Sequence, residues 1–174
     1  MKNIVLIGMP GCGKTSMGRR LQKKLRRPLL DTDDMIVEKE GRSIPQIFAA
    51  EGEAYFRAVE RACVKEAAQG QGQIIATGGG VVLSPENMEA LKETGIIFFL
   101  DVTPESIIRR RTKLSGRPLL QQDEEKVDKK LQKLYRDRIR LYCKYADFRF
   151  SNRCYAKKNL LRIVNTMKRI EGEK

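Results

Sequence analysis

Short apolar runs alternate along the chain with longer stretches in which apolar residues recur at helical spacing. No internal repeat or low-complexity linker interrupts this alternation, which is typical of an α/β fold. Because the runs are short and continuous, they predict buried strands. The five runs are 3–7, 28–30, 73–77, 96–100 and 148–150.

The stretches between these runs predict the helices. Ser84-Pro85 and Thr103-Pro104 each place a capping hydroxyl before a proline, so we expect helices to begin at both prolines. Ser43 is expected to cap a turn whose helical character continues after Gly52. The clearest helical spacing covers 14–25, 53–68, 123–142 and 157–170.

A chain of 174 residues is long enough for one domain with a sizeable core. Since crossovers between parallel strands are right-handed, the strands should form a mostly parallel sheet covered by helices on both faces. Ligands of such sheets bind at the carboxyl ends of the strands. Functional residues are therefore expected directly after the strands or on the helices that follow.

The composition of the chain limits the ligands and the catalytic groups that it can use. Lys and Arg number 35 against 22 Asp and Glu, which gives a formal net charge of +13. Such a surface attracts nucleotides, phosphorylated metabolites, nucleic acid or an anionic membrane face. The chain has no histidine, which excludes Ser-His-Asp and Cys-His triads and HExxH zinc sites. The chemistry must rest on carboxylates, Lys, Arg, backbone amides or a hard metal ion.

Cysteine spacing and the lengths of the apolar runs bear on the compartment. The four cysteines form no CxxC pair, so we expect reduced thiols. The first apolar run is too short for a signal peptide, and no segment reaches the ~18–20 apolar residues that cross a bilayer. We therefore expect a cytoplasmic protein without a membrane partner.

The sharpest motif is GMPGCGKT at 8–15, a complete GxxxxGK[ST] between the first predicted strand and the first predicted helix. Its glycines let backbone N–H groups point inward at a polyphosphate, and the helix N-terminus adds positive charge. Lys14 is expected to reach the β- and γ-phosphates, and the Thr15 hydroxyl to bind Mg²⁺. Cys12 is either a small filler or a thiol activated by the same field. The motif predicts binding of a nucleoside triphosphate.

An acidic cluster follows the second predicted strand. Asp31 and Asp33 point to the same side of an extended segment, so both can face the crevice beyond the phosphate loop. One of these carboxylates could hold a metal ion while the other orients an attacking hydroxyl. Either Asp33 or Asp34 can instead cap the helix that begins at Met35, and we expect Asp34 to do so. Asp101, at the end of the 96–100 strand, competes for the metal ion as a Walker B aspartate would.

Three further features each have a structural and a functional interpretation. Gly78-Gly79-Gly80 forms a tight turn or offers N–H groups to an oxygen-rich substrate. Arg57 is solvated or binds a carboxylate bidentately. The basic stretch 109–117 is a mobile loop that closes over a triphosphate, or a nucleic-acid patch.

Taken together, these segments resemble the shikimate kinase family, over about residues 3–165. The resemblance implies one domain, 1–174, with a three-layer P-loop fold like that of nucleoside monophosphate kinases, a central five-stranded parallel sheet, a substrate-binding helical part at about 32–60 and a mobile lid at about 112–123. It implies ATP, Mg²⁺ and transfer of the γ-phosphoryl group to the 3-hydroxyl of shikimate, in aromatic amino acid biosynthesis. The matching segments are GMPGCGKT at 8–15, LLDTD at 29–33, GRSIPQIF at 41–48, EAYFRAVE at 53–60, TGGGVV at 77–82, GRPLL at 116–120 and RIRLY at 138–142.

The resemblance also implies roles for single residues. Asp33 would orient or deprotonate the attacking hydroxyl, with Lys14 and the lid residue Arg117 as the other catalytic groups. Thr15 and Asp31 would hold Mg²⁺, directly or through water. Arg111 and Arg153 would flank the adenine. The nucleotide-binding set is Gly11, Cys12, Gly13, Lys14, Thr15, Ser16, Arg111, Arg117 and Arg153, and the shikimate-binding set is Asp33, Arg57, Gly78, Gly79, Gly80 and Arg138.

Some alternatives stay open. Arg140 stands where the family usually has proline, so Arg138 and Arg140 are both candidates for the carboxylate clamp. The short segment between Arg111 and Arg117 leaves the adenine role of Arg111 open. The same scaffold could phosphorylate gluconate or a nucleoside monophosphate, act as an ATPase on nucleic acid, or bind nucleotide without catalysis. Aromatic residues are only 6% and Trp is absent, which disfavours nucleic acid; we expect a monomer.

Overall fold

Five parallel strands form one sheet in the order β2-β3-β1-β4-β5. The computed structural model describes the backbone of residues 1–115, 121–151 and 156–172, and the side chains of 1–110, 126–151 and 157–172. Each strand lies within one residue of its predicted bounds. The strands are β1 (Asn3–Ile7), β2 (Leu29–Asp31), β3 (Ile74–Ala76), β4 (Gly95–Asp101) and β5 (Phe148–Ser151).

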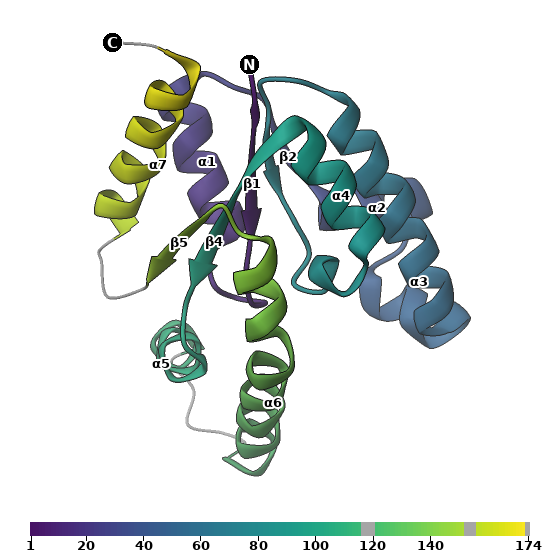
Figure 1. Ribbon diagram of the computed structural model, residues 1–174. Helices are drawn as coiled ribbons and strands as arrows, with labels where there is room; N and C mark the ends of the chain where they lie inside the picture. Colours follow the sequence, from purple (N-terminus) through teal and green to yellow (C-terminus); the bar gives the residue numbers. More distant parts are fainter. Residues whose placement is uncertain (116–120, 152–155, 173–174) are drawn as a thin grey trace.

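Helices cover both faces of this sheet, which confirms the three-layer α/β prediction. In Figure 1, α1 and α7 lie together on one side of the strands, and α3 packs with α2 and α4 on the other. Helix α6 packs on β4 and on the short 3₁₀ helix η1. The helices are α1 (Lys14–Leu25), α2 (Thr32–Glu40), α3 (Ile44–Gln69), η1 (Val81–Leu83), α4 (Pro85–Thr94), α5 (Pro104–Ser115), α6 (Gln121–Tyr145) and α7 (Ala156–Glu171).

The helix starts follow the predicted caps with one exception. Helices begin at both prolines, and the Ser84 hydroxyl accepts a hydrogen bond from the Asn87 N–H at 3.3 Å. The prediction that Asp34 caps a helix from Met35 is wrong. Helix α2 already begins at Thr32, because Asp31 is extended and its carboxylate accepts the Asp33 N–H at 3.1 Å.

Burial on both faces explains why the strands read as unbroken apolar runs. All five residues of β1 are fully buried, and Ile4 lies in register with Ile74 of β3 and Ile96 of β4. The sheet therefore holds the carboxyl ends of β1, β2 and β3 together at one edge. The phosphate loop, the acidic cluster and the triple glycine follow these ends.

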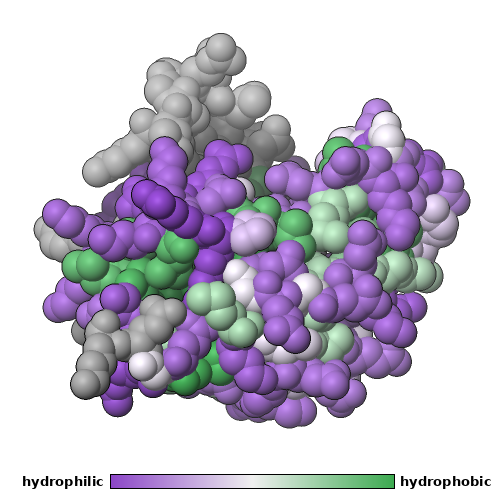
Figure 2. All heavy atoms as spheres, turned by 90° about the horizontal axis from the view of Figure 1, so that it is seen from above, coloured by the Kyte–Doolittle hydropathy of each residue, from purple (hydrophilic) through white to green (hydrophobic). Residues whose placement is uncertain are grey.

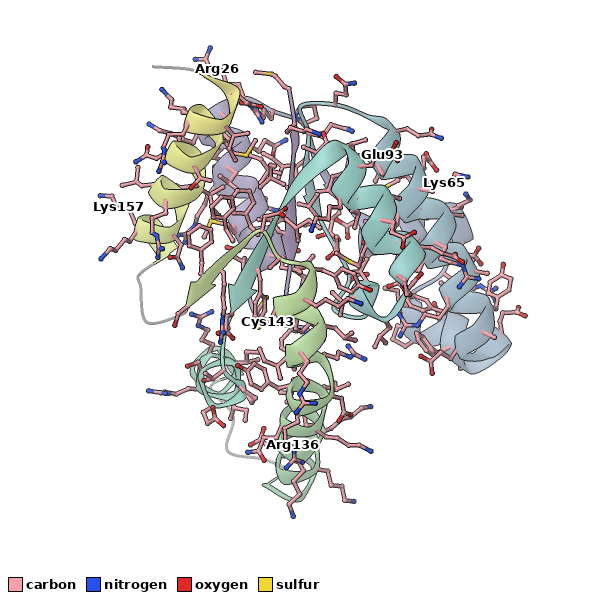
Figure 3. The ribbon with its side chains drawn as sticks, in the orientation of Figure 1. Arg26, Lys65, Glu93, Arg136, Cys143 and Lys157 are labelled. Atoms are coloured by element: carbon pink, nitrogen blue, oxygen red, sulfur yellow. The ribbon has the colours of Figure 1, made fainter. Side chains whose placement is uncertain are left out.

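The net charge resides on the outside. Hydrophilic residues cover most of the face seen in Figure 2, with apolar residues between them in smaller groups. No helix in the described part of the chain is both long and apolar enough to cross a membrane. Charged side chains project from the helices and their ends around the sheet (Figure 3), among them Arg26, Lys65, Glu93, Arg136 and Lys157.

Candidate active site

The phosphate loop links β1 to α1 in the conformation that its glycines require. Gly8 has a φ of 147°, and a Cβ there would lie 2.7 Å from the Leu100 carbonyl oxygen. Lys14 is 8% exposed, and its Nζ donates to the carbonyls of Gly8 and Met9 at 2.9 Å each. The ammonium is thus held at the loop, beside the N-terminus of α1, where an anion would bind.

Cys12 is a buried part of the same loop. It is 4% exposed, and its Sγ lies 3.7 Å from the Lys14 Nζ. Its sulfur also lies where a Cβ on Gly8 would touch it, at 3.0 Å. Its burial favours the filler interpretation of Cys12 over that of a reactive thiol.

The loop and the acidic cluster are joined by a direct hydrogen bond. The Thr15 hydroxyl donates to Asp31 Oδ2 at 2.6 Å, while Asp31 Oδ1 accepts the Asp33 N–H. Asp101 is engaged elsewhere, since Arg149 donates twice to its Oδ2, at 2.9 and 2.7 Å, and the Tyr135 hydroxyl donates to its Oδ1. The geometry thus pairs Thr15 with Asp31 and favours Asp31 over Asp101 as a metal carboxylate.

Asp33 occupies an electrostatically unusual position. Burial raises the pKa of its carboxyl to about 6, and the negative charge of Asp31 adds to this rise while Lys14 opposes it. A Cβ on Gly78 would lie only 2.6 Å from Asp33 Oδ1, so the carboxylate is in close contact with the triple glycine. Asp33 therefore offers a comparatively basic carboxylate next to the phosphate loop.

The triple glycine packs against three other parts of the site and has no room for side chains. A Cβ on Gly79 would lie 2.6 Å from the Pro10 ring, and a Cβ on Gly80 would lie 2.5 Å from Arg57 Nη1. The Gly78 N–H donates to the Thr32 hydroxyl at 3.0 Å. The close approach of backbone to neighbours explains the need for glycine here better than an unusual backbone angle does.

Two arginines converge on this loop from different helices. Arg57 of α3 is held by the buried Glu60 at 2.7 Å and by Glu53 at 3.1 Å, and is itself 19% exposed. Arg138 of α6 donates to the Gly79 carbonyl at 3.1 Å. Arg140 is exposed. The structure thus brings Arg138, rather than Arg140, to the triple glycine.

A residue that the sequence reasoning missed anchors the same carbonyl. The Tyr142 hydroxyl donates to the Gly79 carbonyl at 2.6 Å, and its fully buried ring stacks on Phe99 with centroids 5.0 Å apart. Its place four residues after Arg138, on the same face of α6, was the available signal. Tyr142 thus fixes the position of the triple glycine from the side of the core.

A cavity of about 650 Å³ lies over the phosphate loop. It contains most of the predicted phosphate-binding and metal-binding residues together with Asp33, and also Arg19, Arg20 and Lys23, which sequence reasoning passed over. A second cavity of about 230 Å³ lies beyond Gly13 and Ser16, with Cys12, Leu100, Val102 and Phe150 in its wall. The larger cavity is lined by Pro10, Gly11, Gly13, Lys14, Thr15, Ser16, Arg19, Arg20, Lys23, Asp31, Asp33, Thr77 and Gly79.

Three predicted residues cannot be placed. Arg117 and Arg153 lie outside the described residues, as does the side chain of Arg111. In the predicted lid at 112–123, the backbone of 116–120 and all of the side chains lie outside the described parts of the chain. Their roles stay predictions of the family resemblance.

A phosphate loop after β1, joined to a carboxylate pair after β2 in a parallel sheet of order 2-3-1-4-5, defines a P-loop kinase of small molecules. The family model described as "Shikimate kinase" matches residues 10–168. The chain is 40% identical to a shikimate kinase of Clostridium botulinum strain Kyoto over 174 residues, 99% of each chain. It is 50% identical to that of Symbiobacterium thermophilum over 120 residues, 68% of this chain and 69% of the other.

A solved structure agrees with these relatives. The shikimate kinase from Acinetobacter baumannii, in complex with shikimate, is 34% identical, with a TM-score of 0.82 over 99% of this chain and 94% of that one. The chain belongs to the shikimate kinase family. Its activity is accordingly the ATP-dependent phosphorylation of shikimate, which confirms the prediction made from its motifs.

Proposed function

We propose that the chain transfers the γ-phosphoryl group of ATP to the 3-hydroxyl of shikimate, with Asp33 as the group that orients the hydroxyl and accepts its proton. The position of Asp33 carries this proposal, since the carboxylate shares a cavity with Lys14 and touches Gly78. A general base works best when its pKa lies near the working pH. A pKa of about 6 leaves Asp33 ionised at neutral pH and more basic than an exposed aspartate.

Arg57 and Arg138 clamp the shikimate carboxylate in this proposal. Both guanidinium groups adjoin the triple glycine, one from α3 and one from α6. Guanidinium forks match carboxylates bidentately, so two of them fix both the charge and the orientation of the ring. The backbone of Gly78, Gly79 and Gly80 forms the floor between them.

The phosphate loop binds the triphosphate. The N–H groups of Gly11 to Ser16 and the Lys14 ammonium neutralise charge that spreads over the phosphate oxygens in the transition state. The smaller cavity, walled by Leu100, Val102 and Phe150, suits the apolar faces of the adenine. Arg111, Arg117 and Arg153 complete this site in the proposal by resemblance alone.

Mg²⁺ would be held by Thr15 and Asp31. Both contribute oxygen atoms, the donor type that Mg²⁺ requires, and these two oxygens already lie 2.6 Å apart. Within the described residues no group of three or more Cys, Asp or Glu side chains could hold a metal ion on its own, so phosphate oxygens and water would supply the other ligands. When bound, the ion would neutralise phosphate charge and align the phosphoryl group.

We propose further that the enzyme acts as a monomer in the cytoplasm and without nucleic acid. The thiols of Cys12, Cys63 and Cys143 are free, as expected in a reducing compartment. Size-exclusion chromatography with light scattering tests the monomer, and a mass of two chains at working concentration would refute it.

The decisive experiment follows ADP release from Mg-ATP with shikimate, gluconate and nucleoside monophosphates as acceptors. Shikimate-dependent turnover is expected, and preference for another acceptor would refute the proposal. Arg57→Ala should raise the KM for shikimate about tenfold to a hundredfold, because a charge-assisted contact contributes ~1.5–3 kcal/mol. Arg61→Ala is the matched control, since Arg61 lies one turn further along α3 and is paired with Glu86 on the outside.

A further inference from the structure

Helix α1 carries positive charge well beyond the phosphate loop. Its sequence, KTSMGRRLQKKL, contains no acidic residue. Arg19, Arg20 and Lys23 are exposed, and none of them forms an ion pair with a residue in the described part of the chain. Three charges with no acidic partner among the described side chains thus stand beside a site that binds phosphate.

Helical geometry places these cations in one stripe. Counting from Ser16, they follow at three, four and seven residues, which is the spacing of one helix face. Ser16 and Lys23 are separated by about 10 Å along the axis at ~1.5 Å per residue. The stripe points away from the loop toward Arg26, which marks the far end of α1 in Figure 3. The opposite face of α1 is buried through Met17, Gly18 and Leu21.

The stripe and the phosphate loop share one cavity. Arg19 and Lys23 line the same cavity of about 650 Å³ as Lys14 and Thr15. The acidic residues of this cavity, Asp31 and Asp33, lie at the end of β2. Arg20 also lines the smaller cavity proposed for the adenine, but Arg19 and Lys23 do not. These two side chains therefore extend the phosphate site in a direction that the nucleotide does not take.

We propose that this stripe binds a linear condensed phosphate longer than the triphosphate of ATP. One end of the chain lies in the phosphate loop and the remainder lies along Arg19 and Lys23. Repeated negative charges on a flexible chain match cations spaced along a helix. Nucleic acid fits less well, because no residue that lines the cavity is aromatic and can stack on a base. Such a ligand competes with ATP, since both use the loop.

Calorimetry on the full chain in the presence of Mg²⁺ tests this directly, with pyrophosphate, tripolyphosphate and a longer linear polyphosphate as ligands. We expect the longer polyphosphate to bind at least about tenfold more tightly than tripolyphosphate, as charge-assisted contacts to two further cations imply. The double variant Arg19→Gln with Lys23→Gln should lose this gain. It should keep its affinity for tripolyphosphate and its KM for ATP, which also shows that it folds.

Lys24→Gln is the matched control, because Lys24 is exposed on the same helix but does not line the cavity. Equal affinity for tripolyphosphate and the longer chain would overturn the proposal. An equal loss of the gain in affinity in Lys24→Gln would also overturn it, because net charge alone would then explain the binding. A raised KM for ATP in the double variant would overturn it too, because the cations would then bind the nucleotide. An oligonucleotide that binds with the same dependence on Arg19 and Lys23 would favour nucleic acid instead. Calorimetry needs no shikimate, so the result is independent of the acceptor.

Discussion

Burial makes Asp33 a stronger base than an exposed aspartate and, for the same reason, a costly residue for the fold. Its carboxyl lies against Gly78 and near Asp31, so the ionised form is less well solvated than in the unfolded chain. The opposing charge of Lys14 lowers this cost only in part. Activity and stability therefore depend on this side chain in opposite directions.

The pH profile should report the ionisation of Asp33. With a pKa of about 6, the carboxylate is lost as the pH falls through that value, so kcat/KM for shikimate should fall about tenfold per pH unit below it. Asp33→Asn should lower turnover by roughly 10²–10⁴ and leave ATP binding nearly intact. Steady-state kinetics between pH 5 and 8 and nucleotide titration measure both. Near-normal turnover of the variant would remove Asp33 from the mechanism.

Asp33→Asn should increase the stability of the fold, although it lowers turnover. Because the folded pKa is raised from 3.8 to about 6, Asp33 favours the native state below pH ~4, and that contribution is lost as the pH rises through about 6. Asp33→Asn should therefore raise the free energy of unfolding at pH 7 by on the order of 1–3 kcal/mol, and by much less at pH 4. Denaturant unfolding at both pH values checks this. The exposed Asp34→Asn is the control, and an equal gain there would contradict the explanation.

At the scale of elements, the sequence predicts what depends on local pattern. The strands are predicted to within one residue because burial on both faces leaves unbroken apolar runs, as in β1. The start of α2 was missed because Asp31, Asp33 and Asp34 are all good caps, and only the extended backbone at Asp31 decides between them. The helical character expected to continue after Gly52 is confirmed, because α3 runs from Ile44 to Gln69 with a kink at Gly52, whose backbone angles are not helical (φ 78°, ψ −178°).

The site residues also differ in whether a local sequence pattern predicts them. The phosphate loop is predicted directly by its motif. The preference for Arg138 over Arg140 depends on which face of α6 meets the loop after β3, and no local pattern specifies that contact. The helical spacing of Arg19 and Lys23 can be seen in the sequence. Only the structure shows that both residues line the same cavity as the phosphate loop.

The loop after β3 should respond differently at adjacent positions. A Cβ at position 80 meets the flexible end of Arg57, whereas one at position 79 meets the Pro10 ring at 2.6 Å and its backbone nitrogen at 3.0 Å. Gly80→Ala should therefore raise the KM for shikimate and leave the KM for ATP unchanged. Gly79→Ala should displace the phosphate loop, lower ATP affinity and destabilise the fold by about 1–3 kcal/mol.

Steady-state kinetics with each substrate varied, and thermal unfolding, distinguish the two variants. The same pattern of changes in both would contradict the assignment of Gly80 to the shikimate end and Gly79 to the phosphate loop.

At the scale of the whole molecule, the net charge of +13 surrounds a site whose substrates are anions. The sheet gathers Lys14, Arg57 and Arg138 at one edge, and the excess of Lys and Arg over Asp and Glu in the chain as a whole adds a positive field around them. Fields of this kind increase the rate of encounter with anionic ligands more than they strengthen the bound state. The surface charge should therefore govern how fast ATP arrives rather than how fast it reacts.

Salt dependence separates these two effects. Between about 0.01 M and 0.1 M ionic strength the Debye length falls from ~30 to ~10 Å, which screens the exposed cations from an approaching nucleotide. Contacts within the bound complex are a few Å long and are screened far less. We expect kcat/KM for ATP to fall severalfold over this range while kcat changes little, at constant Mg²⁺. Stopped-flow binding of a fluorescent ATP analogue should place the change in the association rate. If salt accelerated dissociation or lowered kcat instead, the charge would be acting inside the bound complex, and the field would have no separate role in capture.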